Sequence, residues 1–165
     1  MSFTIRWARE ADVPTILRFI RELAAYEREP DAVLATESSL TRDGFRQPQR
    51  FRCFLAECEG QPAGFALFYN SYSTWRGHHG IRLEDLYVTP SRRGQGIGKA
   101  LLAAVAKVAV DEGCPRYEWD VLVWNQPAID VYEAVGANTQ TEWRIMRLAD
   151  AKLEALASHA PPILS

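Results

Sequence analysis

Residues 83–102, LEDLYVTPSRRGQGIGKALL, constrain the fold of this chain more than any other stretch. The first six include strand formers, and Pro90 ends the strand because proline has no N–H for the ladder. Gly94, Gly96 and Gly98 follow at alternate positions, and an apolar pattern of helical period begins directly after them. The stretch therefore predicts a strand, a sharp turn, a glycine-rich loop and a helix in immediate succession.

This glycine-rich loop is suited to binding an anion. Residues without a Cβ atom let backbone N–H groups close on a bound group, and the first N–H groups of the helix are unpaired at the positive end of its dipole. Arg92 and Arg93 precede the glycines and favour an anion such as a pyrophosphate. The spacing fits neither the Rossmann G-x-G-x-x-G nor the P-loop, and a purely structural turn is the alternative.

Composition limits the classes of protein that the chain can belong to. Its 165 residues, 47% of them hydrophobic, predict a single domain, residues 1–165, with its own core. A net charge of −2 does not suggest a nucleic-acid partner, and no segment resembles a signal peptide or a membrane span. The three cysteines, an odd number without metal spacing, favour reduced thiols in the cytoplasm: Cys53, Cys58 and Cys114.

Periodicity and turn residues predict alternating strands and helices of the α/β or α+β class. Strands are expected at residues 4–7, 51–59, 63–72, 83–88, 116–124 and 141–148. Helices are expected at residues 13–29, 36–45, 96–112, 125–135 and 149–157. Asp12 is the expected cap of the first helix. Residues 75–80 are expected to form a loop in which His78 and His79 are exposed and have no partner at ligand spacing, so no metal site is expected.

Residues 93–98, RGQGIG, match the arginine/glutamine-x-x-glycine-x-glycine/alanine signature of the GCN5-related N-acetyltransferases, whose loop binds the pyrophosphate of acetyl-coenzyme A (acetyl-CoA). More narrowly, the chain resembles the diamine branch of that family, which acetylates spermidine, spermine and thialysine. The stretches that carry this resemblance occur in the family's order and span nearly the whole chain: AAYE at 24–27, DGF at 43–45, GFA at 64–66, LED at 83–85, WNQPA at 124–128, and Tyr132.

The resemblance implies a mixed, mostly antiparallel sheet flanked by helices. In this family the central strand and the next one, here residues 83–88 and 117–123, splay apart, and acetyl-CoA lies between them. The resemblance also implies a homodimer in which C-terminal strands are exchanged or packed. It assigns the following residues to the coenzyme: Leu86, Tyr87, Val88, Arg93, Gly94, Gln95, Gly96, Ile97, Gly98, Lys99, Asn125, Pro127 and Ala128.

Glu84 and Tyr132 are the expected catalytic residues. An amine must lose a proton before it attacks, the thioester carbonyl must be polarised, and the departing thiolate is helped by a proton. The resemblance implies Glu84 as the base, acting through water, backbone N–H groups near Leu86 and Val88 as donors to the carbonyl, and Tyr132 as the acid. The alternatives are a solvated carboxylate for Glu84 and a core-edge tyrosine for Tyr132.

The acidic and aromatic residues that match the amine pocket of the diamine branch suit a cationic substrate. They are Tyr26, Glu27, Trp75, Glu84, Asp85 and Glu142. Ser73-Thr74 and Val123 stand where polyamine acetylases carry carboxylates. This loss of negative charge makes a shorter amine or a thialysine-like amino acid as reasonable a substrate as spermidine or spermine.

The function predicted from the sequence is therefore transfer of an acetyl group from acetyl-CoA to a primary amine of a small molecule. Direct attack in a ternary complex is expected, since no cysteine stands where an acyl-enzyme nucleophile would be needed. Two alternatives stay open, namely an acetyltransferase for protein N-termini or lysines and a coenzyme A-binding module without turnover.

Overall fold

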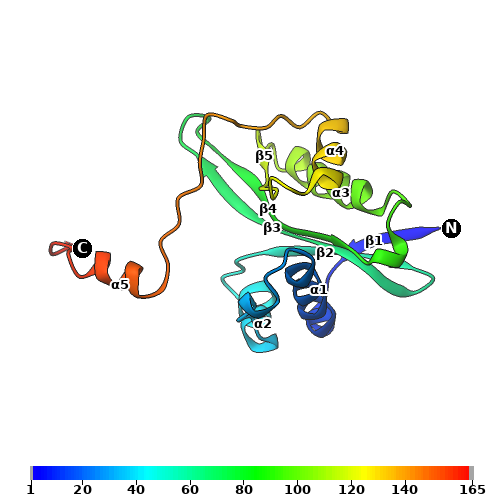
Figure 1. Cartoon of the computed structure of the whole chain (residues 1–165), viewed down its shortest axis with the longest axis horizontal. Coiled ribbons are helices and arrows are strands. Elements are labelled where there is room, and N and C mark those ends of the chain that lie inside the picture. Colours follow the sequence, from blue (N-terminus) through cyan, green and yellow to red (C-terminus); the bar gives the residue numbers. More distant parts are fainter. Residues whose placement is uncertain (1, 164–165) are drawn as a thin grey trace. The chain divides into compact units, whose positions relative to one another are not determined.

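The computed structural model describes residues 2–163. Five strands form one sheet in the order β1-β2-β3-β4-β5. The first three pairings are antiparallel, and β4 pairs with β5 in parallel. The strands are β1 (Phe3–Trp7), β2 (Arg52–Cys58), β3 (Gln61–Ser73), β4 (His78–Val88) and β5 (Tyr117–Glu118). This mixed, mostly antiparallel sheet confirms the predicted fold class (Figure 1).

Within residues 2–163, five α-helices accompany the sheet, and the chain divides by its internal contacts into two compact units, residues 1–128 and 129–165. The helices are α1 (Val13–Tyr26), α2 (Glu37–Phe45), α3 (Ile97–Asp111), α4 (Gln126–Ala134) and α5 (Asp150–Ala157), and 3-10 turns lie at Glu10–Asp12, Pro30–Ala32 and Pro90–Arg92. The first unit holds the sheet with α1, α2 and α3. The second holds most of α4 and all of α5.

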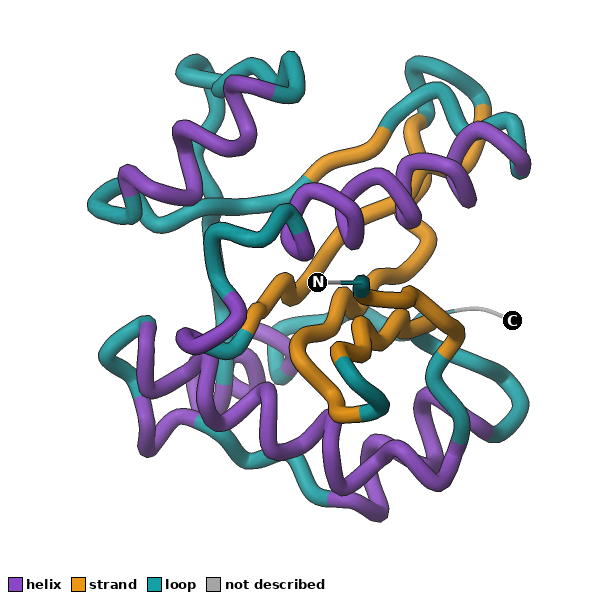
Figure 2. The backbone as a smooth tube through the Cα atoms, turned by 90° about the vertical axis from the view of Figure 1, so that its right-hand side faces the viewer, coloured by secondary structure: helices purple, strands orange, loops and turns teal. Residues whose placement is uncertain are grey.

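The first unit is a three-layer structure, with α1 and α2 on one face of the sheet and α3 on the other (Figures 1 and 2). Apolar side chains at helical spacing on α1 meet alternate residues of β2 and β3 in one cluster, which includes Ile16, Phe19, Leu55 and Phe65. The α3 side of the unit is built from other buried residues, among them Phe68, Leu101 and Val105. Two apolar faces per sheet explain why β2 and β3 are nearly continuous hydrophobic runs.

The starts of α1 and α2 differ in how they are stabilised. Thr36 caps α2, because its hydroxyl accepts a hydrogen bond from the Ser39 N–H at 3.1 Å. Asp12 does not cap α1 with its side chain, which corrects the sequence prediction. Its carboxylate instead accepts from the Arg6 guanidinium at 2.7 and 2.9 Å and from the Arg9 N–H at 2.7 Å.

A β-bulge interrupts the β3–β4 pairing at Glu84. Leu67 pairs with Asp85 whereas Phe68 pairs with Leu83, so Glu84 has no partner in the register. Directly paired residues share a face of the sheet, and the extra residue therefore moves the next side chains to the opposite face. Asp85 consequently follows Leu67 on the α1 face, while Leu83 follows Phe68 on the α3 face.

The β4–β5 pairing is short. It joins only Ile81 to Tyr117 and Arg82 to Glu118, so β5 does not accompany β4 past the bulge. The end of β4 from Leu83 to Val88 therefore has no β5 partner, which agrees with the predicted splaying. The predicted strand at residues 116–124 is correspondingly reduced to Tyr117–Glu118, because beyond Glu118 there is no ladder for it to join.

Two other sequence predictions are wrong. Residues 141–148 are not a strand, since they pair with no strand of the described chain and their side chains are exposed. The segment at residues 75–80 is only partly a loop, because His78, His79 and Gly80 already belong to β4, where they pair with β3. Between residues 2 and 163, no helix combines the length and the apolar composition that crossing a bilayer requires.

Gly64 gives a test of the β3–β4 contact. A Cβ atom there would lie 2.5 Å from the Tyr87 carbonyl oxygen and 3.2 Å from the Val88 Cα atom, and both are backbone atoms that cannot yield cheaply. We expect Gly64→Ala to lower the free energy of unfolding by about 1–3 kcal/mol, as overpacking does. Denaturant titration followed by circular dichroism measures this change.

Gly98→Ala is the matched control, because its Cβ atom would meet only the Val88 Cγ2 atom at 3.8 Å. At that helical position alanine is expected to be neutral or to stabilise by up to about 1 kcal/mol. A Gly64→Ala variant as stable as the original chain would contradict the β3–β4 packing described above.

Candidate active site

The glycine-rich loop leaves the first N–H groups of α3 available to a ligand. Gly94 and Gly96 have φ of +73° and +82°, a left-handed conformation that glycine adopts without steric cost. Gly96 precedes the first helical residue, and no side chain caps the helix. The first helical hydrogen bond runs from Ala100 N–H to the Gly96 carbonyl, so the N–H groups of residues 97–99 lie ahead of it. These donors fit a pyrophosphate.

Arg93 fastens this loop to the end of β4. Its Nε–H donates to the Val88 carbonyl at 3.0 Å, and its guanidinium carbon lies 4.8 Å from the ring centroid of Tyr26 and 5.6 Å from that of Tyr87. A cation over two aromatic rings is stabilised by their negative faces. Arg93 therefore links the loop, the end of β4 and the end of α1.

The end of α1 is also bound to the segment before α4. The Tyr26 hydroxyl donates to Asn125 Oδ1 at 3.0 Å, and the rings of Tyr26 and Trp124 lie 6.0 Å apart. The Arg28 guanidinium stacks over the Trp124 ring at 4.3 Å. The first unit thus brings together three predicted site residues that are far apart in the sequence. They are Tyr26, predicted to bind the substrate, and Arg93 and Asn125, predicted to bind the coenzyme.

Three carboxylates interact at this end of the unit. The pKa of Asp85 is raised to about 7, first by burial and then by the negative charges of Glu84 and Glu27. Burial also raises the pKa of Glu27. Since desolvation and like charges both favour the protonated form of a carboxyl, a cationic group placed among these three would relieve the repulsion. The cluster fits a positively charged ligand.

Glu84 differs from Asp85 in its surroundings because it is the bulged residue. Its side chain is exposed, whereas Asp85 is partly buried. The pKa of Tyr69 is raised by burial and then by the negative charge of Glu84, so the Glu84 carboxylate lies near that tyrosine of β3. A carboxylate in contact with water can pass a proton to solvent, which suits the predicted role of base through water.

The remaining predicted site residues are distributed over both units. Leu86, Tyr87 and Val88 form the end of β4 beside the glycine loop, and Gln95 and Lys99 are exposed on the loop and the first turn of α3. Trp75 is 88% exposed on the β3–β4 turn, at the opposite end of β4 from the loop. Tyr132, on α4, and Glu142, exposed between α4 and α5, belong to the second unit.

The two positions at which the chain departs from the polyamine acetylases have different surroundings. Ser73 is 4% exposed and its hydroxyl accepts a hydrogen bond from the Arg76 N–H at 3.3 Å, so it stabilises the β3–β4 turn. Val123 is 92% exposed. Arg28, by contrast, was not singled out from the sequence, because nothing in its spacing reveals that it stacks on Trp124 almost a hundred residues later.

The β4–β5 pairing ends where the uncapped start of α3 offers N–H groups to an anion. The sequence profile of the Acetyltransferase (GNAT) family matches residues 5–137, and the chain belongs to this family. It is therefore an N-acetyltransferase, and its family implies acetyl-CoA as the cosubstrate. The unpaired N–H groups at the start of α3 fit that molecule's pyrophosphate.

Relatives with assigned activities are similar over most of the chain. Thialysine N-epsilon-acetyltransferase of Bos taurus is 44% identical over 164 residues, covering 93% of this chain and 96% of the relative. L-ornithine N5-acetyltransferase of Arabidopsis thaliana is 32% identical, and the alignment covers 92% of this chain and 86% of the relative. Spermidine/spermine N(1)-acetyltransferase-like protein 1 of Homo sapiens is 36% identical over 94% of this chain and 24% of its own length.

Solved structures share the fold. An integron cassette protein from the mobile metagenome of V. cholerae superposes with a TM-score of 0.79 at 25% identity, covering 95% of this chain and 98% of that one. An aminoglycoside acetyltransferase from an uncultured soil metagenomic sample has a TM-score of 0.75 at 21% identity, covering 89% and 97%. The second match shows the likeness of fold alone.

The raised pKa of Asp85 predicts a pH dependence of stability. With a pKa of about 7 when folded against an ordinary 3.8, this carboxyl holds a proton in the folded chain at pH values where the unfolded chain has lost it. The protonated Asp85 carboxyl therefore contributes fully to the free energy of unfolding below its unfolded pKa, and this contribution is lost as pH rises through about 7. Between about pH 4 and pH 8, the original chain should lose roughly 2–4 kcal/mol of unfolding free energy that the Asp85→Asn variant retains.

Denaturant titrations at both pH values measure this difference. Asp43→Asn is the matched control: Arg42 lowers the pKa of Asp43, so its contribution to stability is lost only as pH falls and does not decline as pH rises toward 8. Parallel pH profiles for Asp85→Asn and the original chain would contradict the burial of Asp85 beside Glu84 and Glu27.

Proposed function

We propose that this enzyme acetylates a primary amine at the end of a short, cationic small molecule, either a thialysine-like amino acid or a diamine. The observation that carries the proposal is the cluster of Glu27, Glu84 and Asp85, in which Asp85 has a pKa of about 7. It lies in the same unit as the glycine loop. Relatives named for thialysine, ornithine and spermidine/spermine acetylation support an amine of this kind.

We propose that acetyl-CoA is held by the end of β4, the glycine loop and the start of α4. Residues 93–99 would bind the pyrophosphate through backbone N–H groups, as expected for an uncapped helix start. Leu86, Tyr87 and Val88 would present backbone groups to the pantetheine arm, and Asn125, Pro127 and Ala128 would line its other side. Tyr26 orients the Asn125 amide by its 3.0 Å hydrogen bond.

The proposed reaction is a direct transfer. Glu84 accepts a proton from the substrate ammonium through water, and the free amine attacks the thioester carbonyl. Backbone N–H groups beside the bulge, near Leu86 and Val88, stabilise the oxyanion that forms. The carbon–sulfur bond then breaks, and Tyr132 donates a proton to the leaving thiolate. The attacking nitrogen loses its second proton through water, which restores the Tyr132 hydroxyl, Glu84 passes its proton to solvent, and the N-acetylated amine and coenzyme A are released. Asp85 and Glu27 attract the substrate's cation.

We propose the thialysine-like class ahead of the longer polyamines. Glu27 and Asp85 are partly buried near the end of α1 and suit a charge close to the reacting nitrogen. Ser73 and Val123 offer no carboxylate for a distal amine, and Ser73 is engaged in its own turn. A polyamine would therefore lose the charge interaction that its far end makes with an acid. Trp75 and Glu142 stay proposed substrate contacts.

We further propose that residues 1–165 act as one acetyltransferase domain and that the enzyme is a cytoplasmic homodimer. The family profile crosses the boundary between the two units, which supports one domain. All three cysteines are free, as a reducing compartment predicts. Ile145, Met146 and Leu156 expose large apolar surfaces, which a second copy of the chain would cover. Light scattering coupled to gel filtration gives the mass that tests the dimer.

A panel of amines tests the proposed function. The purified full chain is incubated with acetyl-CoA and thialysine, lysine, ornithine, putrescine, spermidine or spermine, and the free thiol released is followed over time. We expect kcat/KM for thialysine to exceed that for spermidine by about two- to fivefold, the effect of one lost charge contact of about 0.5–1 kcal/mol. Acetylation of peptide N-termini without turnover of any panel member would overturn the small-amine proposal.

Variants on the best substrate test the proposed catalytic roles. Glu84→Gln should lower kcat by about 100-fold at neutral pH, and Tyr132→Phe by about tenfold with the affinity for acetyl-CoA retained. Glu37→Gln, an exposed residue in the first turn of α2, is the control and should keep full activity. Undiminished kcat in Glu84→Gln would show that another group accepts the proton.

A further inference from the structure

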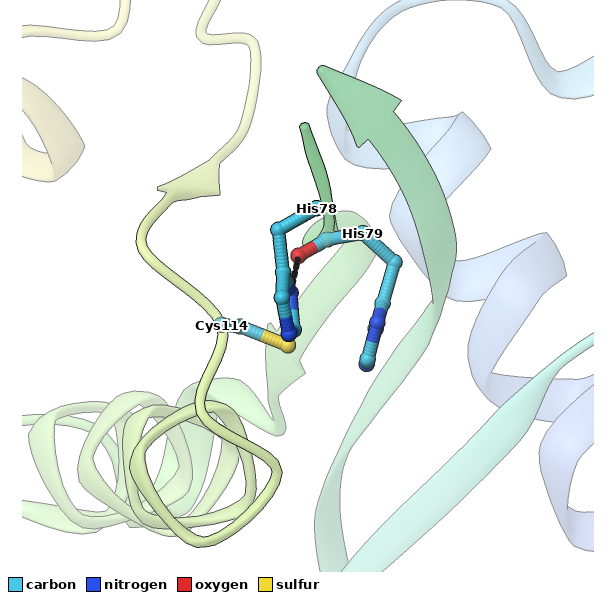
Figure 3. A group of neighbouring side chains, drawn as sticks. All are labelled: His78, His79 and Cys114. Carbon is cyan, nitrogen blue, oxygen red and sulfur yellow. Dashed lines mark hydrogen bonds between the residues drawn. The ribbon is translucent and has the colours of Figure 1, made fainter. Parts of the chain in front are cut away.

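His78, His79 and Cys114 gather at the end of β4 that is distant from the glycine loop (Figure 3). Their ligand atoms all lie within 4.8 Å of one another, and all three side chains are partly buried. The two histidines begin β4, whereas Cys114 follows α3, so two separate segments of the first unit contribute. Nothing in the reaction proposed above uses them.

The backbone holds Cys114 at this place. Gly113 ends α3 with φ of +68°, and the Cys114 N–H donates to the Ala109 carbonyl at 2.8 Å, which closes the helix. Two residues on, the Arg116 carbonyl accepts from the Ile81 N–H at 3.0 Å. A Cβ atom on Gly80 would lie 2.8 Å from that carbonyl oxygen, so the close approach of the turn to β4 requires glycine there.

The hydrogen bond of His78 prepares its ring to act as a ligand. Its Nδ1 atom lies 2.8 Å from the His79 carbonyl oxygen, which can only accept, so Nδ1 carries the proton. In the neutral ring the lone pair is then on Nε2. This atom faces the turn after α3, since it lies 4.0 Å from where a Gly113 Cβ atom would be. A backbone carbonyl on the far ring nitrogen is the usual partner of a metal-binding histidine.

A carboxylate lies beside the cluster. Glu112 Oε2 lies 3.6 Å from His79 Nε2, a separation of the size found between two ligands of one tetrahedral ion. Glu112 is itself fixed by an ion pair with Arg52, which also donates to Asn70 Oδ1 at 2.7 Å. The His78 and His79 rings stack with their centroids 4.5 Å apart, so both imidazoles lie on the same side of the cluster.

We propose that His78, His79 and Cys114 bind a thiophilic divalent cation, with Zn²⁺ as the fitting ion. Zinc is one of few biological cations that bind a set of two imidazole nitrogens and one thiolate. Magnesium and calcium prefer oxygen ligands and are excluded. Water or the Glu112 carboxylate completes the tetrahedron. Binding deprotonates the Cys114 thiol and releases that proton to solvent.

The position of this proposed metal site gives it a structural role. The fifteen residues of α3, at 1.5 Å each, separate its two ends by about 22 Å, with the glycine loop at the first end and Cys114 just past the second. The ion would fasten the α3–β5 turn to the start of β4, where the only β4–β5 pairing of the described chain is found. It would stabilise the folded chain without contacting acetyl-CoA.

Cobalt titration tests this proposal. The full chain is reduced, stripped with a chelator and titrated with Co²⁺, and Zn²⁺ is then added to displace it. We expect one Co²⁺ per chain, with a thiolate-to-cobalt charge-transfer band and the intense visible bands of tetrahedral cobalt. Cys114→Ser should abolish the charge-transfer band, and His78→Gln and His79→Gln should each weaken Zn²⁺ binding by at least about tenfold.

The controls are His159→Gln and Cys58→Ala, which change the third histidine and a buried cysteine outside the cluster. Both should keep the cobalt spectrum. Zn²⁺ should raise the melting temperature of the original chain and of the controls but not of Cys114→Ser, and acetyltransferase activity without added metal verifies that each variant is folded. An octahedral cobalt spectrum without a thiolate band, or equal Zn²⁺ affinity in all variants, would overturn the proposal.

Discussion

The extra residue in β4 determines how this sheet can work as an active site. Because Glu84 has no partner on β3, the side chains before and after it emerge on opposite faces. Leu83 joins the α3 side of the core, and Asp85 and Tyr87 join the α1 side. Without the bulge, Asp85 would face α3 and would be separated from Glu27 by the sheet.

The bulge also coincides with the end of the β4–β5 pairing. Beyond Arg82 the strand has no β5 partner, and its last residues lie beside the glycine loop that opens α3. The end of β4 and the start of α3 thereby present their backbone groups to the same region beside the glycine loop. The coenzyme site proposed here depends on backbone geometry more than on particular side chains, which agrees with the exposure of most loop side chains.

The sequence predicted those parts of the fold that have local signals. Alternation and turn residues placed β2, β3 and the end of β4, and the glycines placed the start of α3 next to Gly96. The strand at residues 141–148 failed because β-propensity describes a residue's fit to a sheet and cannot supply a neighbouring strand. Residues 116–124 failed for the same reason, since only Tyr117 and Glu118 find partners on β4.

The candidate site was predictable only where a motif or the resemblance marked it. The glycine loop, the end of α1 and residues 124–128 carried such marks, and the Tyr26–Asn125 hydrogen bond joins the last two. Interactions between distant segments had no local signal. The raised pKa of Asp85 depends on burial by the tertiary fold, and the approach of Cys114 to His78 depends on how the turn after α3 meets β4.

The central claim is that the uncapped start of α3 and its glycine loop bind the pyrophosphate of acetyl-CoA. Calorimetric titration of the full chain with coenzyme A and with pantetheine, which lacks the pyrophosphate and the nucleotide, tests it most directly. We predict that coenzyme A binds at least about 100-fold more tightly, a difference of about 2.8 kcal/mol, and that Gly96→Val removes most of that difference. Equal affinities for the two ligands, or a Gly96→Val variant that retains the full difference, would contradict the account.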